Sequence, residues 1–347
     1  MVAEDARDGS WSEPMIAARA FRARQLDTHP LLCAPVSRLP AGRQRDGEEE
    51  TAFAGRYRLR HLRGEGGMAL VYTAVDLRSG VLVAVKMLRH ELIRNQEARL
   101  RFHCEARMTA RVAHPNVVSP IDAGHAAGDR PYLVMEHLEG RTLGELIAEE
   151  GPLPPERALR IAVQACRGLE AAHCAEIIHR DVKPDNLFIC RDGQGSELVK
   201  VLDFGIGKVC AAGDPLARAI EALDSGRVVG TPHYMAPEQV CHPASVNEQT
   251  DVFSLGLVLR EAMTGVRPHE GKSGGAIIDE LLTDFLSAAP VQRAALARGT
   301  EHLSELEDVV AAAHAPDRRD RYPSARAFGA ALSAALRGLA ASSVRAA

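Results

Sequence analysis

Apolar and polar positions repeat with different periods in different parts of the chain. Residues Tyr57 to Leu62 alternate, a glycine-rich stretch follows, and Leu70 to Val75 is largely apolar, which predicts a β-hairpin. A short apolar run from Tyr132 to Glu136 is typical of a buried strand. Between them, from Glu97 to Ala113, apolar side chains recur every fourth residue, which predicts a helix. The recurring positions are Leu100, Cys104 and Met108.

The remainder of the chain has mainly helical patterns. Helices are expected at residues 142–148, 155–174, 250–259, 277–286, 303–313 and 325–336. A charged stretch from His179 to Asn186 lies between two apolar runs, Ile177–Ile178 and Leu187–Ile189. Pro184 argues against a helix through this stretch. We therefore expect a loop held between two short buried strands.

Composition narrows the class of protein. The 347 residues are enough for two domains or one large two-lobed domain, and the net charge of −4 gives no general attraction to nucleic acid or anionic membranes. No apolar run approaches the roughly 20 residues that a membrane-spanning helix needs, and no secretory signal is evident. The seven cysteines are dispersed without CxxC spacing, which favours reduced thiols. A soluble, cytoplasmic protein is expected.

The first fifty residues differ from the rest. They show no sustained periodicity and end in a charged run, so residues 1–56 are predicted to be a flexible leader, with a folded or docking element as the alternative. Their acidic residues argue against an organelle transit peptide. At the other end, residues 337–347 are expected to be a short Ala/Ser tail.

The glycine-rich turn and a nearby lysine suggest phosphate binding. The stretch comprises Gly64, Glu65, Gly66, Gly67, Met68, Ala69 and Val71, and it resembles the GxGxxGxV loop of protein kinases, with alanine at the third glycine position. Glycine allows backbone N–H groups to approach phosphate oxygens closely. Lys86 ends the apolar run Val83-Ala84-Val85, which resembles the VAIK strand. Its expected partner is Glu105, with Glu97 as the alternative.

Three further motifs follow in the order that this family has. His179-Arg180-Asp181-x-Lys183-x-x-Asn186 resembles the catalytic loop, and Asp203-Phe204-Gly205 resembles the DFG motif. The lip sequence Gly230-Thr231-Pro232-x-Tyr234-Met235-Ala236-Pro237-Glu238 ends in the APE motif. Together these motifs make the chain similar to bacterial serine/threonine protein kinases of eukaryotic type.

The resemblance implies a fold and its boundaries. We expect an α+β, bilobal protein kinase fold at residues 57–336. The small lobe, residues 57–136, would be a mainly antiparallel sheet with one key helix, and the large lobe, residues 139–336, would be mainly helical.

The same resemblance assigns roles to individual residues. Asp181 would orient the substrate hydroxyl and accept its proton, while Lys183 would neutralise the γ-phosphate. Lys86 would hold the α- and β-phosphates of ATP, and Asn186 and Asp203 would bind Mg²⁺, with Mn²⁺ as an alternative. His179 and Phe204 would pack together as structural supports. Further contacts with ATP are assigned to Ala84, Met135 as gatekeeper, the backbone of Glu136 and Leu138, and Phe188.

The lip and the lysine after Asp181 favour a protein substrate with serine or threonine acceptors. Two alternatives are a pseudokinase that serves as a binding scaffold and a small-molecule kinase. The pseudokinase is disfavoured because Lys86, Asp181, Asn186 and Asp203 are all present. The small-molecule kinase is disfavoured by the lip. A homodimer for trans-autophosphorylation is left open.

Regulation is suggested by the arginine before the catalytic aspartate. Phosphate on the segment after Asp203 would pair with Arg180, and Ser225, six residues before Thr231, is the predicted autophosphorylation site. The alternative is that this segment needs no phosphate.

Two structural supports are also predicted. Glu238 is expected to pair with Arg321 or, alternatively, Arg319. Asp251 would either cap its own helix or, by the resemblance, bond the backbone of the catalytic loop.

Overall fold

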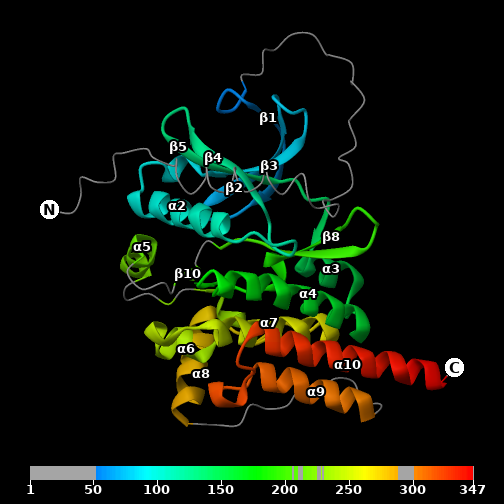
Figure 1. The fold of residues 1–347 in the computed structure, drawn as a ribbon. Coiled ribbons are helices and arrows are strands. Elements are labelled where there is room, and N and C mark those ends of the chain that lie inside the picture. Colours follow the sequence, from blue (N-terminus) through cyan, green and yellow to red (C-terminus); the bar gives the residue numbers. More distant parts are fainter. Residues whose placement is uncertain are drawn as a thin grey trace. The chain divides into compact units, whose positions relative to one another are not determined.

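The computed structural model describes residues 52–204, 207–209, 214–224, 228, 230–287 and 301–346, and the chain divides into two compact units (Figure 1). The first unit contains described residues 52–113, 118–139 and 191–196. The second contains residues 114–117, 140–190 and the described residues from 197 onward.

The first unit is a five-stranded antiparallel sheet with one long α-helix. Its elements are β1 (Tyr57–Glu65), β2 (Ala69–Asp76), β3 (Leu82–Leu88), the 3₁₀ turn η2 (His90–Leu92), α2 (Gln96–Arg111), β4 (Pro120–Ala126) and β5 (Arg130–Glu136). The strand order is β1-β2-β3-β5-β4. Over the described residues, this arrangement confirms the predicted hairpin, the buried strand and the key helix.

Alternation along β3 determines which side chains face α2. Val83, Val85 and Met87 pack on one face of the sheet with Tyr57 and Tyr132. Leu88 and Leu133, on the other face, pack against α2. Because strand side chains alternate, Lys86 is on the same face as Leu88 and is directed to the helix.

One detail of the α2 prediction is wrong. Cys104 and Met108 are buried, but Leu100 is 40% exposed. The buried face of α2 is centred on Phe102 and Glu105, and Leu100 falls beyond the edge that Cys104 forms. A strict four-residue repeat drifts around a helix of 3.6 residues per turn, so it follows the edge of this face and not its centre.

The second unit is mainly helical. Its helices are α3 (Leu143–Glu150), α4 (Pro155–Cys174), α5 (Pro215–Asp224), α6 (Pro237–Cys241), α7 (Glu248–Thr264), α8 (Gly274–Ser287), α9 (Glu301–Ala313) and α10 (Ala325–Ala346). Its short strands are β6 (Gly140–Thr142), β7 (Ile177–Ile178), β8 (Leu187–Arg191), β9 (Glu197–Val201) and β10 (Lys208–Val209). The described residues of this unit also form the 3₁₀ turns η3 (Pro184–Asn186), η4 (Pro232–Tyr234), η5 (Pro243–Ser245) and η6 (Arg318–Asp320). The pairings are β6-β8-β9 and β10-β7.

Helix α7 is the central helix of this unit, because it is buried over most of its length. Its N-cap is Asn247, whose side chain accepts a hydrogen bond from the Gln249 N–H. The alternative that Asp251 caps this helix is therefore wrong, since Asp251 lies four residues beyond the cap.

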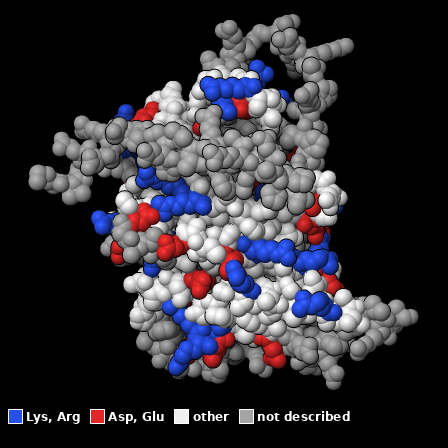
Figure 2. Space-filling view, in the orientation of Figure 1, with Lys and Arg blue, Asp and Glu red and all other residues white. Residues whose placement is uncertain are grey.

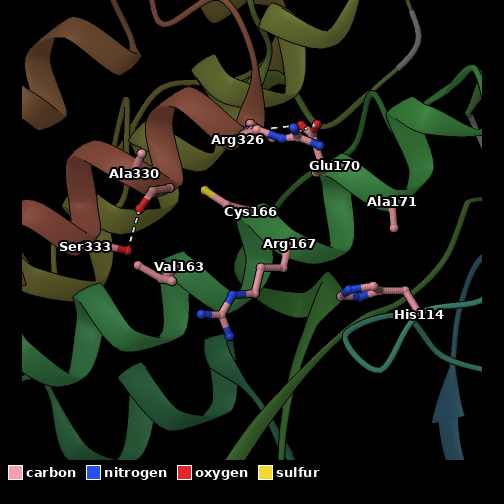
Figure 3. A pocket seen from close by; sticks show the side chains of 11 residues that line it. His114, Val163, Cys166, Arg167, Glu170, Ala171, Arg326, Ala330 and Ser333 are labelled. Carbon is pink, nitrogen blue, oxygen red and sulfur yellow. Dashed lines mark hydrogen bonds and ion pairs between the residues drawn. The ribbon is translucent and has the colours of Figure 1, made fainter.

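Helix α10 packs along α4 and runs to Ala346, ten residues past the expected end at Leu336 (Figure 1). The Ala-rich sequence of residues 337–346 favours helix, and composition alone does not show where the helix stops. A pocket of about 390 Å³ opens between the two helices, with Cys166 at its base and the Arg326–Glu170 ion pair at its rim (Figure 3). None of the predicted site residues lines this pocket.

Surface charge is mixed on the face shown in Figure 2, where basic and acidic side chains are interspersed over the described residues. None of the helices in the described ranges combines the length and apolar character needed to cross a bilayer.

Candidate active site

In the first unit, Lys86 and Glu105 form the predicted ion pair. Lys86 Nζ donates to Glu105 Oε1, and both side chains are buried. Glu97, the alternative, pairs instead with Arg101 of its own helix at 3.2 Å. Removing two charges from water is costly, so a buried pair of this kind is more readily explained by a role in binding than by stability.

The glycine-rich turn between β1 and β2 is exposed from Glu65 to Gly67. The Gly66 N–H donates to the Ala69 carbonyl at 2.9 Å, and a Cβ added at Gly67 would meet nothing within 4 Å. Ala69 itself is already in β2, buried with Leu88, which explains why alanine is accommodated there. Arg89, which the motif did not indicate, braces the turn by donating to the Gly66 carbonyl at 2.8 Å and to Glu65 at 2.6 Å.

The residues predicted to contact adenine follow β5. Met135 pairs with Ala84 across the β3–β5 ladder and packs with the core beside α2. The Glu136 N–H donates to the Ser119 carbonyl at 3.0 Å, so this backbone N–H is already used within the first unit. Leu138 is partly buried just beyond the strand. In the second unit, Phe188 is buried in β8.

In the second unit, Asp251 holds the backbone of the predicted catalytic loop, residues 179–186. This fully buried carboxylate accepts the His179 N–H and the Arg180 N–H, each at 2.8 Å. The bonds confirm the second alternative for Asp251. Burial would raise the pKa of Asp251, but the hydrogen bond from His173 and the donors around His179 outweigh it and lower that pKa.

His173, at the end of α4, is a support that the motifs did not predict. Its Nε2 lies 2.7 Å from Asp251 Oδ2, so Asp251 is shared between a helix and the loop. Arg180 has a left-handed φ of +65°, an uncommon conformation for arginine. Such a conformation persists where the surroundings determine it, and here Asp251 holds the backbone N–H while Gln239 Nε2 donates to the Arg180 carbonyl at 2.9 Å.

His179 and Phe204 pack together as predicted, with ring centroids 4.9 Å apart. His179 Nε2 lies 2.8 Å from the Leu202 carbonyl, and the Asp181 N–H donates to His179 Nδ1 at 3.2 Å. A carbonyl can only accept and an N–H can only donate, so the proton is on Nε2. Both ring nitrogens of His179 therefore make hydrogen bonds to the backbone, which is consistent with a structural role.

Asp181 is the centre of a dense polar network. Its Oδ1 accepts the Thr231 hydroxyl at 2.6 Å and the Thr231 N–H at 3.0 Å. Its Oδ2 accepts Lys183 Nζ at 2.7 Å, and that ammonium also donates to Thr231 Oγ1 at 3.0 Å. The network holds the carboxylate in one orientation with a cation beside it. A carboxylate so placed can receive a proton from a bound hydroxyl.

Asn186 and Asp203 supply oxygen ligands suited to a hard cation. Asn186 Nδ2 donates to the Asp181 carbonyl at 2.8 Å, which fixes the amide and leaves its oxygen as the group for a metal. Asp203 is exposed and has a left-handed φ of +54°. Mg²⁺ usually takes one or two protein carboxylates together with phosphate oxygens and water, so this pair of oxygen donors fits it.

The substrate lip is anchored by Glu238. Arg321 donates to its two oxygens at 2.8 and 3.1 Å, and the Arg321 side chain is fully buried. Arg319, the alternative, is exposed and pairs with Asp317, so that alternative is wrong. Arg318 contributes a further contact with Glu238 at 3.3 Å.

Two more contacts link the lip to its surroundings. The Tyr234 hydroxyl donates to Glu261 Oε2 at 2.6 Å inside the unit. Gln239 accepts the Ala236 N–H at 3.0 Å while its amide nitrogen donates to the Arg180 carbonyl. Gln239 directly follows the APE motif in sequence, but its partner is 59 residues away along the chain. No local pattern identifies such a contact.

The guanidinium of Arg180 binds two described points of the segment that follows Asp203. Its Nη2 donates to Asp224 Oδ2 at 2.5 Å and to the Gly207 carbonyl at 3.0 Å. Ser225, the predicted phosphorylation site, lies outside the described residues and stays a prediction.

One unit carries a lysine–glutamate pair and a glycine-rich turn, and the other carries an aspartate network with oxygen ligands. These features are typical of enzymes that transfer phosphoryl groups. The family model "Protein kinase domain" matches residues 57–329. The chain belongs to the protein kinase domain family.

Individual relatives are bacterial serine/threonine-protein kinases. The chain is 41% identical to PknB of Mycobacterium leprae over 224 residues, which is 64% of this chain and 34% of PknB. It is 36% identical to pkn3 of Myxococcus xanthus over 285 residues, 81% of this chain and 50% of pkn3. The chain thus spans half or less of the length of these curated relatives.

A solved structure shows the same fold. The kinase domain of Mycobacterium tuberculosis PknI matches with a TM-score of 0.57 and 23% identity, covering 84% of this chain and all of that one. The likeness confirms the expected α+β kinase fold, and at this level of identity it shows the fold alone.

Proposed function

We propose that this chain is an ATP- and Mg²⁺-dependent protein serine/threonine kinase, with its kinase domain at residues 57–336. The observation that carries the proposal is the network in which Lys183 and Thr231 hold the Asp181 carboxylate. That network joins the catalytic loop to the substrate lip. In phosphoryl transfer, a proton is removed from the acceptor hydroxyl beside the transferred group. A carboxylate held in this way meets that requirement.

In this proposal the residues of the second unit act on the acceptor and the phosphoryl group. Asp181 orients the acceptor hydroxyl and takes its proton, because its carboxylate is held in place and its neighbours do not compete as bases. Lys183 offsets the charge that develops on the phosphoryl oxygens. Asn186 and Asp203 would hold Mg²⁺. The bound metal supplies charge neutralisation between the phosphates.

The first unit binds and orients the nucleotide. Lys86, held by Glu105, presents its ammonium to the α- and β-phosphates. The turn from Gly64 to Ala69, with Val71 following, offers backbone N–H groups to the phosphates. The adenine would lie against Ala84, Met135, Glu136 and Leu138, and Phe188 is a further proposed contact of ATP.

Protein substrates with serine or threonine acceptors are favoured by the lip and by the relatives. Lys183 and Thr231 form the pair expected of a serine/threonine kinase. We place the reaction in the cytoplasm, where ATP and Mg²⁺ are available, with Mn²⁺ as an alternative metal. A homodimer for trans-autophosphorylation is a further proposal. A pseudokinase scaffold is the competing function, but no residue of the network has been lost.

A phosphoryl-transfer assay tests the proposal through Lys86 on β3 and two glutamates on α2, Glu105 and the control Glu97. The purified full chain is incubated with Mg²⁺, γ-labelled ATP and a generic protein substrate. We expect label on the substrate with wild type, and at least about a tenfold lower rate for Lys86→Met and Glu105→Gln, since both lose a buried charge-assisted contact. Glu97→Gln, on the same helix, should match wild type. ATP binding without transfer by wild type would instead support the scaffold.

A further inference from the structure

Arg89 directly follows strand β3 and contacts the glycine-rich turn at three points. Its backbone N–H donates to the Met68 carbonyl at 3.0 Å, and its Nε donates to the Gly66 carbonyl at 2.8 Å. Its Nη2 donates to Glu65 Oε1 at 2.6 Å. One residue therefore holds two carbonyl groups and one carboxylate within four consecutive positions of the turn.

These contacts determine where a free N–H group of the turn is directed. The carbonyl and the N–H of a trans peptide point in opposite directions, so a Gly66 carbonyl held by Arg89 directs the Gly67 N–H away from Arg89. The Gly66 N–H is already used by the Ala69 carbonyl at 2.9 Å. Among the described residues, the N–H groups of Gly67 and Met68 have no hydrogen-bond partner. The turn therefore keeps donors for an anion, and Arg89 fixes the direction of one of them.

The strand that ends at Arg89 also carries Lys86, the other residue proposed to bind the phosphates. Strand β3 pairs with β2 through Lys86 and Val71 and, two positions later, through Leu88 and Ala69. This ladder fixes the spacing between Lys86 and the end of β3. Because Arg89 follows at once and holds the turn, the lysine and the N–H groups of the turn are positioned by the same short segment.

The surroundings of the Arg89 guanidinium favour holding the turn over attracting a phosphate directly. Besides the ion pair with Glu65, its Nη1 lies 3.5 Å from Glu91 Oε1 in η2. Two carboxylates beside one guanidinium leave no net positive charge there. The Glu65 and Glu91 side chains are 55% and 65% exposed, so these ion pairs are screened by water and contribute little themselves. The bond to the Gly66 carbonyl is therefore the contact that we expect to matter most.

We propose that Arg89 is a positioning residue that holds the glycine-rich turn in register with Lys86, so that the turn binds the phosphates of ATP. The inference rests on the proposed function, specifically on its ATP-binding step. Arg89 acts through the backbone of the turn. Its loss should therefore weaken the binding of the phosphates and leave the binding of the nucleoside unchanged.

Isothermal titration calorimetry on the full chain separates these two parts of the ligand, with Mg²⁺-ATP and adenosine as probes. We expect Arg89→Ala to raise the Kd for ATP by about tenfold, as for the loss of one hydrogen bond from a charged donor, and to leave the Kd for adenosine within about twofold. A similar increase in both values would indicate general damage to the fold and would overturn the proposal.

Arg99 on α2 provides a matched control. It also donates to a backbone carbonyl and a carboxylate, both of Asp129, at 2.9 and 2.7 Å, and its side chain is about as exposed as that of Arg89. Arg99→Ala should bind ATP and adenosine as wild type does. If Arg99→Ala weakens ATP binding as much as Arg89→Ala does, the effect is not specific to the turn and the proposal fails.

A lysine at the same position distinguishes directed hydrogen bonds from charge alone. Arg89→Lys keeps the positive charge but lacks the planar fork that reaches the Gly66 carbonyl and Glu65 together. We expect its Kd for ATP to stay at least about threefold above that of wild type. Wild-type affinity for ATP in Arg89→Lys would contradict the proposal.

The two proposals fail in different ways. If wild type binds ATP and Arg89→Ala weakens that binding selectively, but no phosphate is transferred, the positioning role is supported and the kinase function is refuted. If wild type transfers phosphate and Arg89→Ala binds ATP as tightly as wild type, the positioning role is refuted and the kinase function is retained. Absence of ATP binding by wild type would overturn both.

Discussion

At the scale of single residues, the hydroxyl of Thr231 makes a short contact with the Asp181 carboxylate. It donates to Asp181 Oδ1 at 2.6 Å and accepts from Lys183 at 3.0 Å. The motif placed Thr231 in the lip, and the structure places it in contact with Asp181. It therefore links correct folding of the lip to the orientation of the proposed base.

The hydroxyl contact predicts the effect of two substitutions. Thr231→Val keeps the shape of the side chain and removes the hydroxyl, so kcat should fall by about ten- to a hundredfold, as expected for a hydrogen bond to a charged group. Thr231→Ser keeps the hydroxyl and should retain most activity. Steady-state kinetics with thermal unfolding as a check on folding provide the measurement. Equal activity of the valine and serine variants would contradict a role for the hydroxyl.

Some contacts between residues could be predicted and others could not. Lys86–Glu105 and Glu238–Arg321 were predicted because each partner belongs to a recognisable motif or has few competitors nearby. His173, Gln239 and Asp224 were missed because their partners are 44 to 78 residues away and no spacing rule connects them. Their roles depend on the folded backbone.

At the scale of elements, the starts and types of helices were predictable and some of their ends were not. Helix α4 has the predicted bounds. Pro154 precedes its first residue, and after Cys174 the chain turns at Glu176, which has a left-handed φ of +59°. Helix α10 runs past its predicted end, since alanine-rich sequence gives no stop signal. The close packing of α10 on α4 was also not predictable from periodicity. It depends on a glycine: a Cβ at Gly329 would lie 3.1 Å from the Cβ of Cys166.

Two glycines of α10 therefore predict stability changes of opposite sign. Gly329→Ala should lower the free energy of unfolding by about 1 kcal/mol, because the Cys166 Cβ is fixed to the backbone of α4 and the helices must shift slightly to admit the methyl group. Gly338→Ala meets nothing within 4 Å and should raise it by up to about 1 kcal/mol through helix propensity. Chemical denaturation measures both. A stabilised Gly329→Ala variant would contradict the described packing.

The anchor of the lip gives a second stability prediction at this scale. Removing the positive charge with Arg321→Met leaves Glu238 buried with Arg318 as a weaker partner. The expected loss of stability is about 3–5 kcal/mol, the usual effect of breaking a buried ion pair. Arg319→Met, at an exposed pair two residues earlier, should change stability by less than about 1 kcal/mol. Similar losses in both variants would show that Arg321 is not the anchor.

At the scale of the whole molecule, buried carboxylates connect stability to pH. Burial would raise the pKa of Asp251, but His173 and His179 together outweigh it and lower that pKa in the folded protein. The bond from Arg56 lowers the pKa of Asp76 to about 2. A group with a depressed folded pKa stabilises the protein above its unfolded pKa, about 3.9 for aspartate. That contribution is lost as pH falls through the folded pKa.

Stability should therefore fall on acidification from about pH 5 to pH 2–3, where the folded protein binds fewer protons than the unfolded chain. Asp251→Asn should be less stable than wild type at pH 7 and should show a shallower decline with acid. The unfolding midpoint in urea across this pH range provides the measurement. A parallel decline in the two proteins would show that Asp251 does not contribute to the pH dependence.

The central claim is that Asp181 serves as the base of a protein serine/threonine kinase, and its neighbour Asp185 offers a matched control, exposed in the same loop. The measurement is the initial rate of γ-phosphate transfer from Mg²⁺-ATP to serine and threonine of a protein substrate. We predict that Asp181→Asn lowers the rate by about a hundredfold or more, and that Asp185→Asn retains the wild-type rate. Equal rates for Asp181→Asn and wild type, or no transfer by wild type, would contradict this account.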